Sequence, residues 1–199
     1  ATVVYPPADT EFYTPDATAK RDGPYLVVSA LAPYKRVDHA VEAFRKMPDR
    51  QLVIIGTGQH GKVLQRDVPA NVTFLGWGDE ATLRDHYRSC RALLFPGEED
   101  FGIVPVEAMA CGAPVIAYDA GGARETVADL LDPEGPEPTG LRYEPQTVEG
   151  LSEAIETFEA RRSELDPACA VARAQQFSRQ AFREAYQAFV AAHLPASTN

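Results

Sequence analysis

The chain has 199 residues, of which 45% are hydrophobic, so it can bury a sizeable core and is expected to form one α/β domain. Its formal net charge of −10 argues against a general nucleic-acid or anionic-membrane partner, although a small phosphorylated ligand needs only local donors. The three cysteines, Cys90, Cys111 and Cys169, are too widely spaced for a zinc site or a disulfide framework, so we expect a reducing, cytoplasmic compartment.

Residues 1–24 are expected to be a linker. The segment has a short strand-like run at 3–5 followed by prolines and acids, and its first residue is alanine rather than methionine. No apolar run here or later approaches the roughly 18 residues that a membrane-spanning helix needs. We therefore expect 1–24 to connect this chain to a preceding part rather than to act as a secretion signal.

A regular alternation of strands and helices begins at Tyr25. Apolar runs of strand length occur at 26–30, 51–55, 72–75, 92–95 and 114–117. Helical patterns lie between them at 35–47, 62–66 and 79–90, from just after Glu99 to Gly112, and from about 123 onward. Strands that are apolar along their whole length are typical of a parallel sheet covered on both faces. The pattern predicts a doubly wound, Rossmann-like α/β fold.

The pattern becomes less regular after Asp129. A proline- and acid-rich loop at 130–140 precedes a short segment, 141–144, that we interpret as an edge strand. Helical periodicity returns at 151–161, 168–177 and 179–193, with Ser178 as the expected N-cap of the last helix. The last helix carries one aromatic and apolar stripe, formed by Phe182, Tyr186, Phe189 and Val190. Such a stripe predicts a core or interdomain contact rather than a ligand site.

The segment 91–126 concentrates the groups that suit a ligand. The strand at 92–95 runs into the acidic residues 98–100, and a helix N-terminus opens directly beyond them. Pro105 is tolerated in the first turn of this helix, and Gly112 is its expected stop. The backbone N–H groups of 101–104 have no intrahelical partner and, with the helix dipole, favour an anion such as a phosphate. Gly102 carries no side chain that would block its approach.

Glu99 and Glu107 are separated by seven residues, one at the strand end and one inside the helix. This spacing allows both carboxylates to face one crevice, where they would accept hydrogen bonds from sugar hydroxyls. An anion held by the backbone and hydroxyls held by carboxylates together describe a nucleotide sugar. The alternative is that the acids 98–100 only stabilise the start of the helix through its dipole, by about 0.3–1 kcal/mol each.

Lys35 and Arg36 lie in the loop after the first strand, at the start of the predicted helix. Cations are unfavourable at a helix N-terminus, so their presence suggests an anionic partner, more strongly for Lys35 than for Arg36. The alternative is that both are solvated surface residues. The four histidines show no ligand spacing and no Asp-x-Asp pair is present, so we expect no metal.

The run GTGQHG, with Gly56, Gly58 and Gly61, follows a strand and opens a helix, as a dinucleotide fingerprint does. It follows the second strand of the alternation rather than the first. We therefore interpret it as a glycine turn at the same ligand crevice, which leaves a dinucleotide-dependent oxidoreductase as the less favoured alternative. Gly121 and Gly122 form a second loop that either approaches a ligand or makes an ordinary turn.

Five stretches together resemble the C-terminal half of a retaining glycosyltransferase of family four, of the GT-B type with two Rossmann-like domains. They are VVYPPADTEFY, YLVVSALAPYKRVDHAVEAF, LVIIGTGQ, NVTFLGWG and LLFPGEEDFGIVPVEAMACGAPVIAYDAGGARETV. The resemblance covers about residues 3–190. Its most specific part is the Glu-x7-Glu motif from Glu99 to Glu107.

The resemblance implies a role for each matching position. Lys35 would neutralise the leaving diphosphate and Glu99 would contact the donor sugar, and these two are the expected catalytic residues. Glu107 would hold the ribose hydroxyls. The other expected donor-binding residues are Arg36, Gly58, Gly76, Trp77, Asp100, Phe101, Gly102, Ile103 and Val104, with Gly76 and Trp77 beside the base. The implied reaction retains anomeric configuration and uses a nucleotide sugar, first of all GDP-mannose, without a metal or another cofactor.

Two departures from the family pattern are visible. Many members carry an arginine where this chain has Ala30, so one phosphate-binding cation is absent. The resemblance covers only the C-terminal half of the family pattern, so we expect the N-terminal domain that supplies the acceptor site to lie outside this sequence. We accordingly expect a linker at 1–24, a nucleotide-sugar-binding domain at 25–165, and helices at 166–199 that pack against the missing domain. Any peripheral membrane association, at the inner face, would come through that missing half. A non-catalytic nucleotide-sugar-binding module stays open as an alternative.

Overall fold

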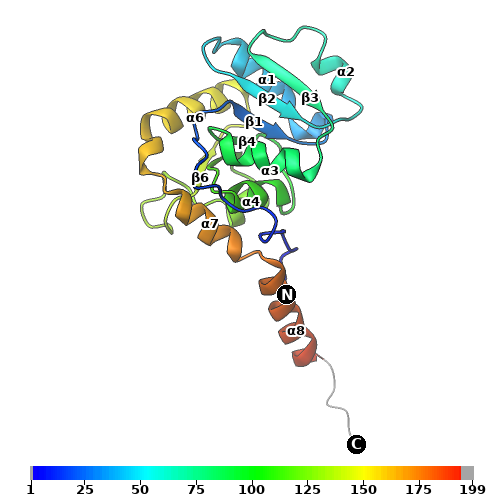
Figure 1. Ribbon diagram of the computed structural model, residues 1–199, viewed down its shortest axis with the longest axis vertical. Coiled ribbons are helices and arrows are strands. Elements are labelled where there is room, and N and C mark those ends of the chain that lie inside the picture. The colour runs from blue at the N-terminus through cyan, green and yellow to red at the C-terminus, as the bar shows by residue number, and fades with distance from the viewer. Residues whose placement is uncertain (1, 194–199) are drawn as a thin grey trace, which may run out of the picture.

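The computed structural model describes residues 2–193 and contains a six-stranded sheet in which every neighbouring pair is parallel. The strands are β1 (Tyr25–Val28), β2 (Leu52–Ile55), β3 (Val72–Gly76), β4 (Leu93–Phe95), β5 (Val115–Tyr118) and β6 (Gly140–Tyr143). Their order across the sheet is β3-β2-β1-β4-β5-β6, shown in Figure 1. The order reverses direction between β1 and β4, and at such a point a crevice opens at the carboxyl ends of the strands. The predicted doubly wound fold is confirmed.

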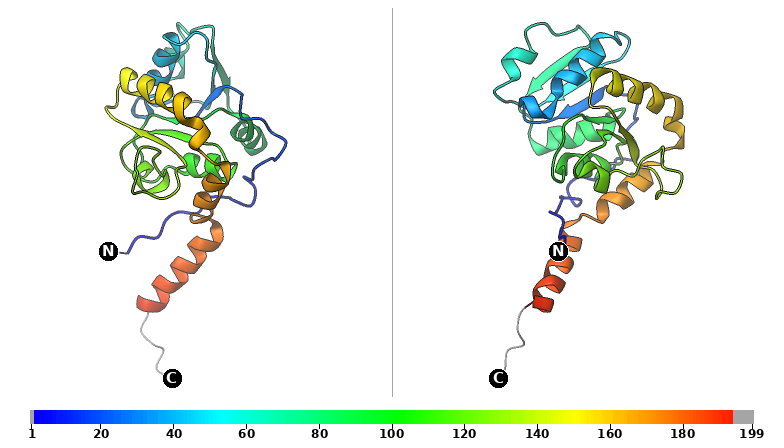
Figure 2. Two further views of the ribbon diagram at one scale, coloured as in Figure 1. Left: turned by 90° about the vertical axis from the view of Figure 1, so that its left-hand side faces the viewer. Right: turned by 180° about the vertical axis from the view of Figure 1, so that it is seen from behind.

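Helices cover both faces of the sheet. One face carries α1 (Val37–Arg45), α2 (Gly61–Leu64) and α6 (Val148–Arg161), and the other carries α3 (Glu80–Ser89), α4 (Ile103–Ala110), α5 (Ala123–Thr126) and α7 (Pro167–Gln175). The left-hand view in Figure 2 shows α1 and α6 on one side of the strands and α3 on the other. Two short 3₁₀ turns, η1 (Pro33–Lys35) and η2 (Arg162–Glu164), precede α1 and follow α6.

Alternating side chains along each strand supply the two cores. Tyr25 and Val27 of β1 point into the core beneath α1 and α6, whereas Leu26 points into the core beneath α3, α4 and α7. In the first core the Tyr25 ring lies 5.4 Å from that of Phe44 and 6.2 Å from that of Phe158. Both faces of each strand must therefore be apolar, which explains the continuous apolar runs in the sequence.

One buried side chain, Asn71, closes the C-terminal end of α1. Its amide nitrogen donates to the carbonyl oxygens of Phe44 at 3.0 Å, Met47 at 3.0 Å and Arg50 at 2.7 Å. The backbone carbonyl of Asn71 also accepts from the N–H of Leu52 at 2.9 Å, which sets the start of β2 beside β3. Asn71 thus adds a side-chain donor to carbonyls in and after the last turn of α1, of which those of Phe44 and Met47 also accept backbone N–H groups.

Two of the expected elements, the strand-like run at 3–5 and the helix at 35–47, differ in the structure. The strand-like run at 3–5 forms no strand; Ala8, further along, makes an isolated bridge with Ser178. Pro6 and Pro7 lack the N–H groups that a strand extending from 3–5 would need. The predicted helix at 35–47 begins only at Val37, because the preceding residue adopts a left-handed conformation. The predicted edge strand at 141–144 is confirmed as β6.

The last helix, α8 (Arg179–His193), extends away from the sheet and its covering helices (Figures 1 and 2). None of its residues is buried, and the rings of Phe182 and Tyr186 stack on each other at 5.8 Å. The predicted stripe is therefore present on an unburied helix face. Among residues 2–193, no helix combines the length and the apolar character required to span a bilayer.

Candidate functional site

A crevice opens at the carboxyl edge of the sheet, where the strand order reverses. Here an open hollow of about 300 Å³ is lined by the ends of β1 and β2, the loop after β3, and helices α3 and α4. The lining residues are Val28, Ser29, Ala30, Ile55, Gly56, Thr57, Trp77, Gly78, Leu83 and Val104. Trp77 is 76% exposed at the rim, and next to it Gly76 has a φ of 74° with open space around it. Of the predicted donor-binding residues, Trp77 and Val104 line this hollow. Lys35, Glu99 and Glu107 are not among its lining residues.

Lys35 and Glu99 meet beside this edge as an ion pair between Nζ and Oε1. Lys35 belongs to η1, after β1, and Glu99 follows β4, and these two strands are neighbours in the sheet. Their side chains are only 14% and 28% exposed. A Cβ at Gly97 would lie 2.9 Å from the Cα of Lys35, so the absence of a side chain at this position allows the loops to approach. The predicted phosphate cation and the predicted sugar carboxylate are brought into direct contact.

The N-terminus of α4 opens next to this pair. Gly102 is its N-cap, with a φ of 78°, and no side chain bonds to the first N–H groups of the helix. A Cβ at Gly102 would meet the ring of Phe95 at 3.0 Å, which together with the positive φ explains the glycine. Ile103, the first helical residue, is 41% exposed. The free N–H groups and the helix dipole make this end suited to an anion.

Glu107 lies one turn further along α4 and has a different partner from Glu99. The hydroxyl of the buried Tyr87 donates to its Oε2 at 3.2 Å. Burial raises the pKa of Glu107 to about 7, the Tyr87 hydrogen bond opposes this rise, and the charges of Glu80 and Asp9 add to it. Burial and Glu107 together raise the pKa of Tyr87. The carboxyl is therefore held near its titration midpoint at neutral pH.

Arg36 is paired within the protein. Its guanidinium donates to Asp38, with Nε–Oδ1 and Nη2–Oδ2 distances of 3.2 and 3.0 Å, and it also contacts the ring of His39. Its φ of 53° ends η1 and places it as the N-cap of α1. The role of Arg36 toward a donor stays a prediction.

The glycines of GTGQHG pack against the protein's own backbone. A Cβ at Gly56, whose φ is 142°, would lie 1.9 Å from the Ser29 carbonyl oxygen, and one at Gly58 would lie 2.4 Å from that of Leu31. Both glycines are therefore needed to pack the loop after β2 onto the loop after β1. This packing accounts for the two glycines without a dinucleotide.

Gly121 and Gly122 serve the acidic loop in the same way. The N–H of Gly122 donates to the carbonyl oxygen of Glu99 at 2.8 Å. A Cβ at Gly121 would lie 2.2 Å from that oxygen, and one at Gly122 would lie 2.3 Å from the Cα of Phe101. These glycines hold the loop that carries Glu99, and Asp100 within that loop is exposed.

Two features of the site were not assigned to it from the sequence. Tyr87 contacts Glu107, and the sequence signal for it is a large aromatic in the largely polar helix α3. The ring of Phe101 packs between those of Tyr5 and Phe177. Nothing in the local pattern links these distant positions.

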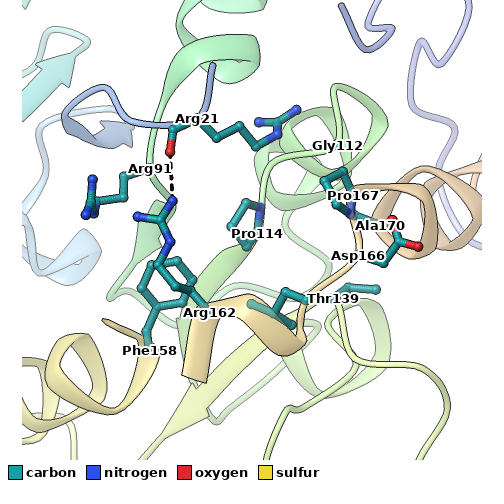
Figure 3. Close-up of a pocket in the computed structure, with 11 residues that line it drawn as sticks. Arg21, Arg91, Gly112, Pro114, Thr139, Phe158, Arg162, Asp166, Pro167 and Ala170 are labelled. Carbon is teal, nitrogen blue, oxygen red and sulfur yellow. Dashed lines mark hydrogen bonds between the residues drawn. The ribbon is translucent and has the colours of Figure 1, made fainter. Parts of the chain in front are cut away.

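We also considered metal sites and the cavity shown in Figure 3 as alternative locations. Within residues 2–193, no group of three or more His, Cys, Asp or Glu side chains is arranged to hold a metal ion. A separate cavity of about 180 Å³ lies at the opposite edge of the sheet (Figure 3). Of its arginines, Arg21 donates to carbonyl groups at the ends of α3 and α4, Arg91 pairs with Glu159, and Arg162 donates to the Arg21 carbonyl at 3.3 Å. These cations are satisfied by the fold.

Comparison with known proteins gives a consistent result. The sequence model of the family described as "Glycosyl transferases group 1" matches residues 13–178. A GDP-mannose-dependent monoacylated alpha-(1-6)-phosphatidylinositol monomannoside mannosyltransferase of Corynebacterium glutamicum is 35% identical over 142 residues, which are 64% of this chain and 35% of that protein. A GDP-mannose-dependent alpha-mannosyltransferase of Mycolicibacterium smegmatis is 45% identical over 115 residues, 54% of this chain and 30% of that protein. The chain thus spans well under half the length of these relatives.

Solved structures show the same relation. The crystal structure of Anabaena HepE in complex with UDP and glucose superposes with a TM-score of 0.77 at 23% identity, covering 97% of this chain and 57% of that one. Sucrose-phosphate synthase from Thermosynechococcus elongatus superposes with a TM-score of 0.78 at 26% identity, covering 96% and 53%. The fold described above is therefore that of one half of these longer chains.

Proposed function

The chain belongs to the glycosyl transferases group 1 family, and on that premise we propose that it is the donor-binding half of a retaining hexosyltransferase. The nucleotide sugar would lie in the crevice at the carboxyl edge, with its diphosphate at the N-terminus of α4. The observation that carries this proposal is the contact between Lys35 and Glu99 beside that helix end. This contact supports the proposal because the cation proposed to bind phosphate and the carboxylate proposed to bind sugar hydroxyls are neighbours.

The Lys35–Glu99 pair suggests how donor binding prepares the reaction. Without a donor, each charge neutralises the other. A diphosphate arriving at the N-terminus of α4 would attract Lys35 and release Glu99, which is then free to accept hydrogen bonds from the sugar. As the nucleoside diphosphate departs, charge builds on its β-phosphate, and Lys35 and the helix N–H groups would stabilise it. Removing one such preorganised donor typically costs about 10²–10³-fold in rate.

The remaining donor contacts follow from the positions of the other residues. Glu107 would hold the ribose hydroxyls, and Trp77 and Gly76, at the exposed rim, would lie beside the base. GDP-mannose is our first candidate donor, because the two mannosyltransferases named above are GDP-mannose-dependent. We propose that no divalent metal takes part.

The acceptor would bind between this chain and a second half of the enzyme. The relatives are far longer than the matched segment, which supports such a second half. Residues 1–24 would form the connection to it, residues 25–165 the donor domain, and helices in 166–199 a contact surface. The unburied stripe on α8 suits such a contact. Any attachment to the inner face of a membrane would come through that half.

Titration with a nucleotide panel tests the proposal. Trp77 is the chain's only tryptophan and stands at the crevice, so its fluorescence reports binding there. We expect GDP or UDP to bind weakly, NAD not to bind, and Lys35→Met to weaken diphosphate binding. Absence of binding by GDP, UDP and ADP at millimolar concentration would refute the donor site. Sugar transfer by these 199 residues alone would refute the division of the active site between two halves.

A non-catalytic nucleotide-sugar-binding module is distinguished by a second measurement. Such a module would bind the same ligands but would show no turnover when the chain is joined to its second half. The expected result for the enzyme is turnover of the joined protein that is lost in Lys35→Met.

A further inference from the structure

Three aromatic rings from distant parts of the chain meet behind the acidic loop. Tyr5 lies in the N-terminal segment, Phe101 in the loop that carries Glu99, and Phe177 at the junction of α7 and α8. Their ring centroids are separated by 5.7 Å for Tyr5–Phe101, 5.3 Å for Tyr5–Phe177 and 5.4 Å for Phe101–Phe177. Each ring touches the other two, and we call this cluster the aromatic clamp.

The clamp is fixed by hydrogen bonds on its outer side. The N–H of Ala8 donates to the carbonyl oxygen of Phe177 at 2.8 Å, which ties the N-terminal segment to the α7–α8 junction. In Figure 1 this segment runs beside the end of α7 and the start of α8. The hydroxyl of Tyr5 donates to Glu125 of α5, and the guanidinium of Arg173 lies 5.6 Å from the Phe177 ring centroid. The two outer rings therefore have defined positions.

The clamp reaches the candidate site by two routes. Phe101 follows Glu99 by two residues, so the position of its ring constrains the backbone that carries the carboxylate. The second route passes through α5: Tyr5 bonds Glu125 of this helix, and Gly122, at its start, donates to the Glu99 carbonyl oxygen. Both routes end at the loop 98–102, just before the N-terminus of α4.

We propose that Tyr5 and Phe177 are positioning residues for the loop 98–102, holding it in the one conformation that binds a nucleotide-sugar donor. This inference rests on the proposed function for its ligand. The loop consists of Glu98, Glu99, Asp100, Phe101 and Gly102, of which Glu98 and Asp100 are exposed. Besides the clamp, it is held by the glycine turn at 121–122, by the Lys35–Glu99 ion pair and by the packing of Gly102 on Phe95. Neither positioning residue lines the crevice.

The expected loss of affinity depends on the fraction of chains in which the loop 98–102 has the binding conformation. The apparent dissociation constant equals the intrinsic one divided by the fraction of chains that are competent to bind. If removal of the Phe177 or Tyr5 ring lowers the competent fraction from near one to about a fifth, the affinity for the donor falls about fivefold. Exchange of backbone amides at 99–104 would become faster at the same time, because local opening of the loop would be more frequent.

The experiment compares Phe177→Leu with Phe158→Leu. Phe158 is a buried phenylalanine in the core on the opposite face of the sheet, so its truncation removes the same atoms far from the loop. The affinity of GDP and UDP is measured by Trp77 fluorescence, amide exchange by mass spectrometry, and stability by urea unfolding. Phe177→Leu is expected to weaken binding about three- to tenfold and to speed exchange at 99–104. Phe158→Leu is expected to lower stability but to leave both quantities unchanged.

Two Tyr5 variants extend the test and guard against a Phe177 variant that does not fold. Tyr5→Leu removes the ring and should reproduce both effects, whereas Tyr5→Phe keeps the ring and should largely restore wild-type affinity. Unchanged exchange at 99–104 in both Phe177→Leu and Tyr5→Leu overturns the proposal. The exchange measurement needs no ligand. If wild type binds neither GDP nor UDP while loop exchange still rises in the variants, the clamp stands and the proposed donor site falls.

Discussion

Glu107 offers the sharpest test of the donor site, because its charge is expected to change near neutral pH. Burial raises the pKa of its carboxyl to about 7 in the unliganded protein, against an ordinary value of 4.5. A carboxylate accepts hydrogen bonds from both ribose hydroxyls, whereas the neutral acid is a poorer acceptor. Affinity for a nucleoside diphosphate should therefore rise as pH increases through about 7.

The size of this effect follows from the fraction ionised. With a pKa of about 7, roughly a tenth of the chains carry the Glu107 carboxylate at pH 6 and roughly nine tenths carry it at pH 8. Affinity should then increase up to about tenfold across this range, which corresponds to about 1.4 kcal/mol. Glu107→Gln should lose the increase, and at pH 8 it should bind more weakly by about 1.5 kcal/mol, the low end for a charge-assisted hydrogen bond at a partly wet site.

The assay is a fluorescence titration of Trp77 with GDP and UDP at pH 6, 7 and 8. The ligand's own phosphate also titrates near pH 6, so the informative quantity is the ratio of wild-type to Glu107→Gln affinity at each pH. Glu80→Gln is the matched control: Glu80 raises the pKa of Glu107, so this variant should shift the midpoint to lower pH while keeping the rise. An affinity ratio that stays constant from pH 6 to pH 8 would refute the assignment of Glu107 to the ribose.

The same pKa shift sets the sign of a stability effect. Because the folded-state pKa of Glu107 lies above its unfolded value, the protonated form is the one that the fold favours. Its contribution to the unfolding free energy is complete below about pH 4.5 and is lost as pH rises through about 7. Urea unfolding of wild type and Glu107→Gln should therefore diverge over this interval, with wild type losing stability relative to the variant.

Three further predictions concern other residues and the absence of a metal. Glu99→Gln should leave GDP affinity unchanged or slightly higher in calorimetry, because Lys35 loses its partner, yet lower kcat once the chain is joined to its second half, as for an interaction made mainly in the transition state. Loss of diphosphate binding in this variant would mean that the roles of the two glutamates are reversed. Asn71→Ala should lower the unfolding free energy in urea by about 1–3 kcal/mol, since the two N–H donors that its amide shares among three carbonyl oxygens are lost, and Asn71→Asp should cost more. Diphosphate affinity measured with and without a chelator should agree; a tenfold drop, about 1.4 kcal/mol, would reveal a metal site.

Most of the sheet could be predicted from the sequence, because each parallel strand is buried on both faces and so appears as an unbroken apolar run. Tyr25 to Val28 of β1 illustrates this, with side chains entering both cores in turn. The run at 3–5 is the exception. It resembles a strand locally, but whether a segment pairs depends on a free neighbouring edge and on the N–H groups of the following residues, which Pro6 and Pro7 lack.

The local sequence patterns predicted which residues make close contacts at the site, but not whether the contacted group is a ligand or the protein itself. Gly56 and Gly122 mark positions without room for a side chain, and the structure shows that the neighbouring group is the protein's own backbone, at Ser29 and at Phe101. Arg36 is a similar case. Its charge suggested an anion, whereas its left-handed conformation and its pairing with Asp38 depend on geometry that no periodicity encodes.

The contact between Lys35 and Glu99 shows why the rest required the tertiary structure. Each residue was identified from the loop that carries it, but the loops follow β1 and β4, which are not consecutive in the chain. They meet only because the sheet order runs β3-β2-β1-β4, so that the connection after β3 crosses back to the other side of β1. The crevice lies next to this reversal, at the carboxyl ends of β1 and β2 and against α4, the helix that follows β4. The step that creates space for a ligand thus also brings together the cation and the carboxylate proposed to bind its phosphate and its sugar.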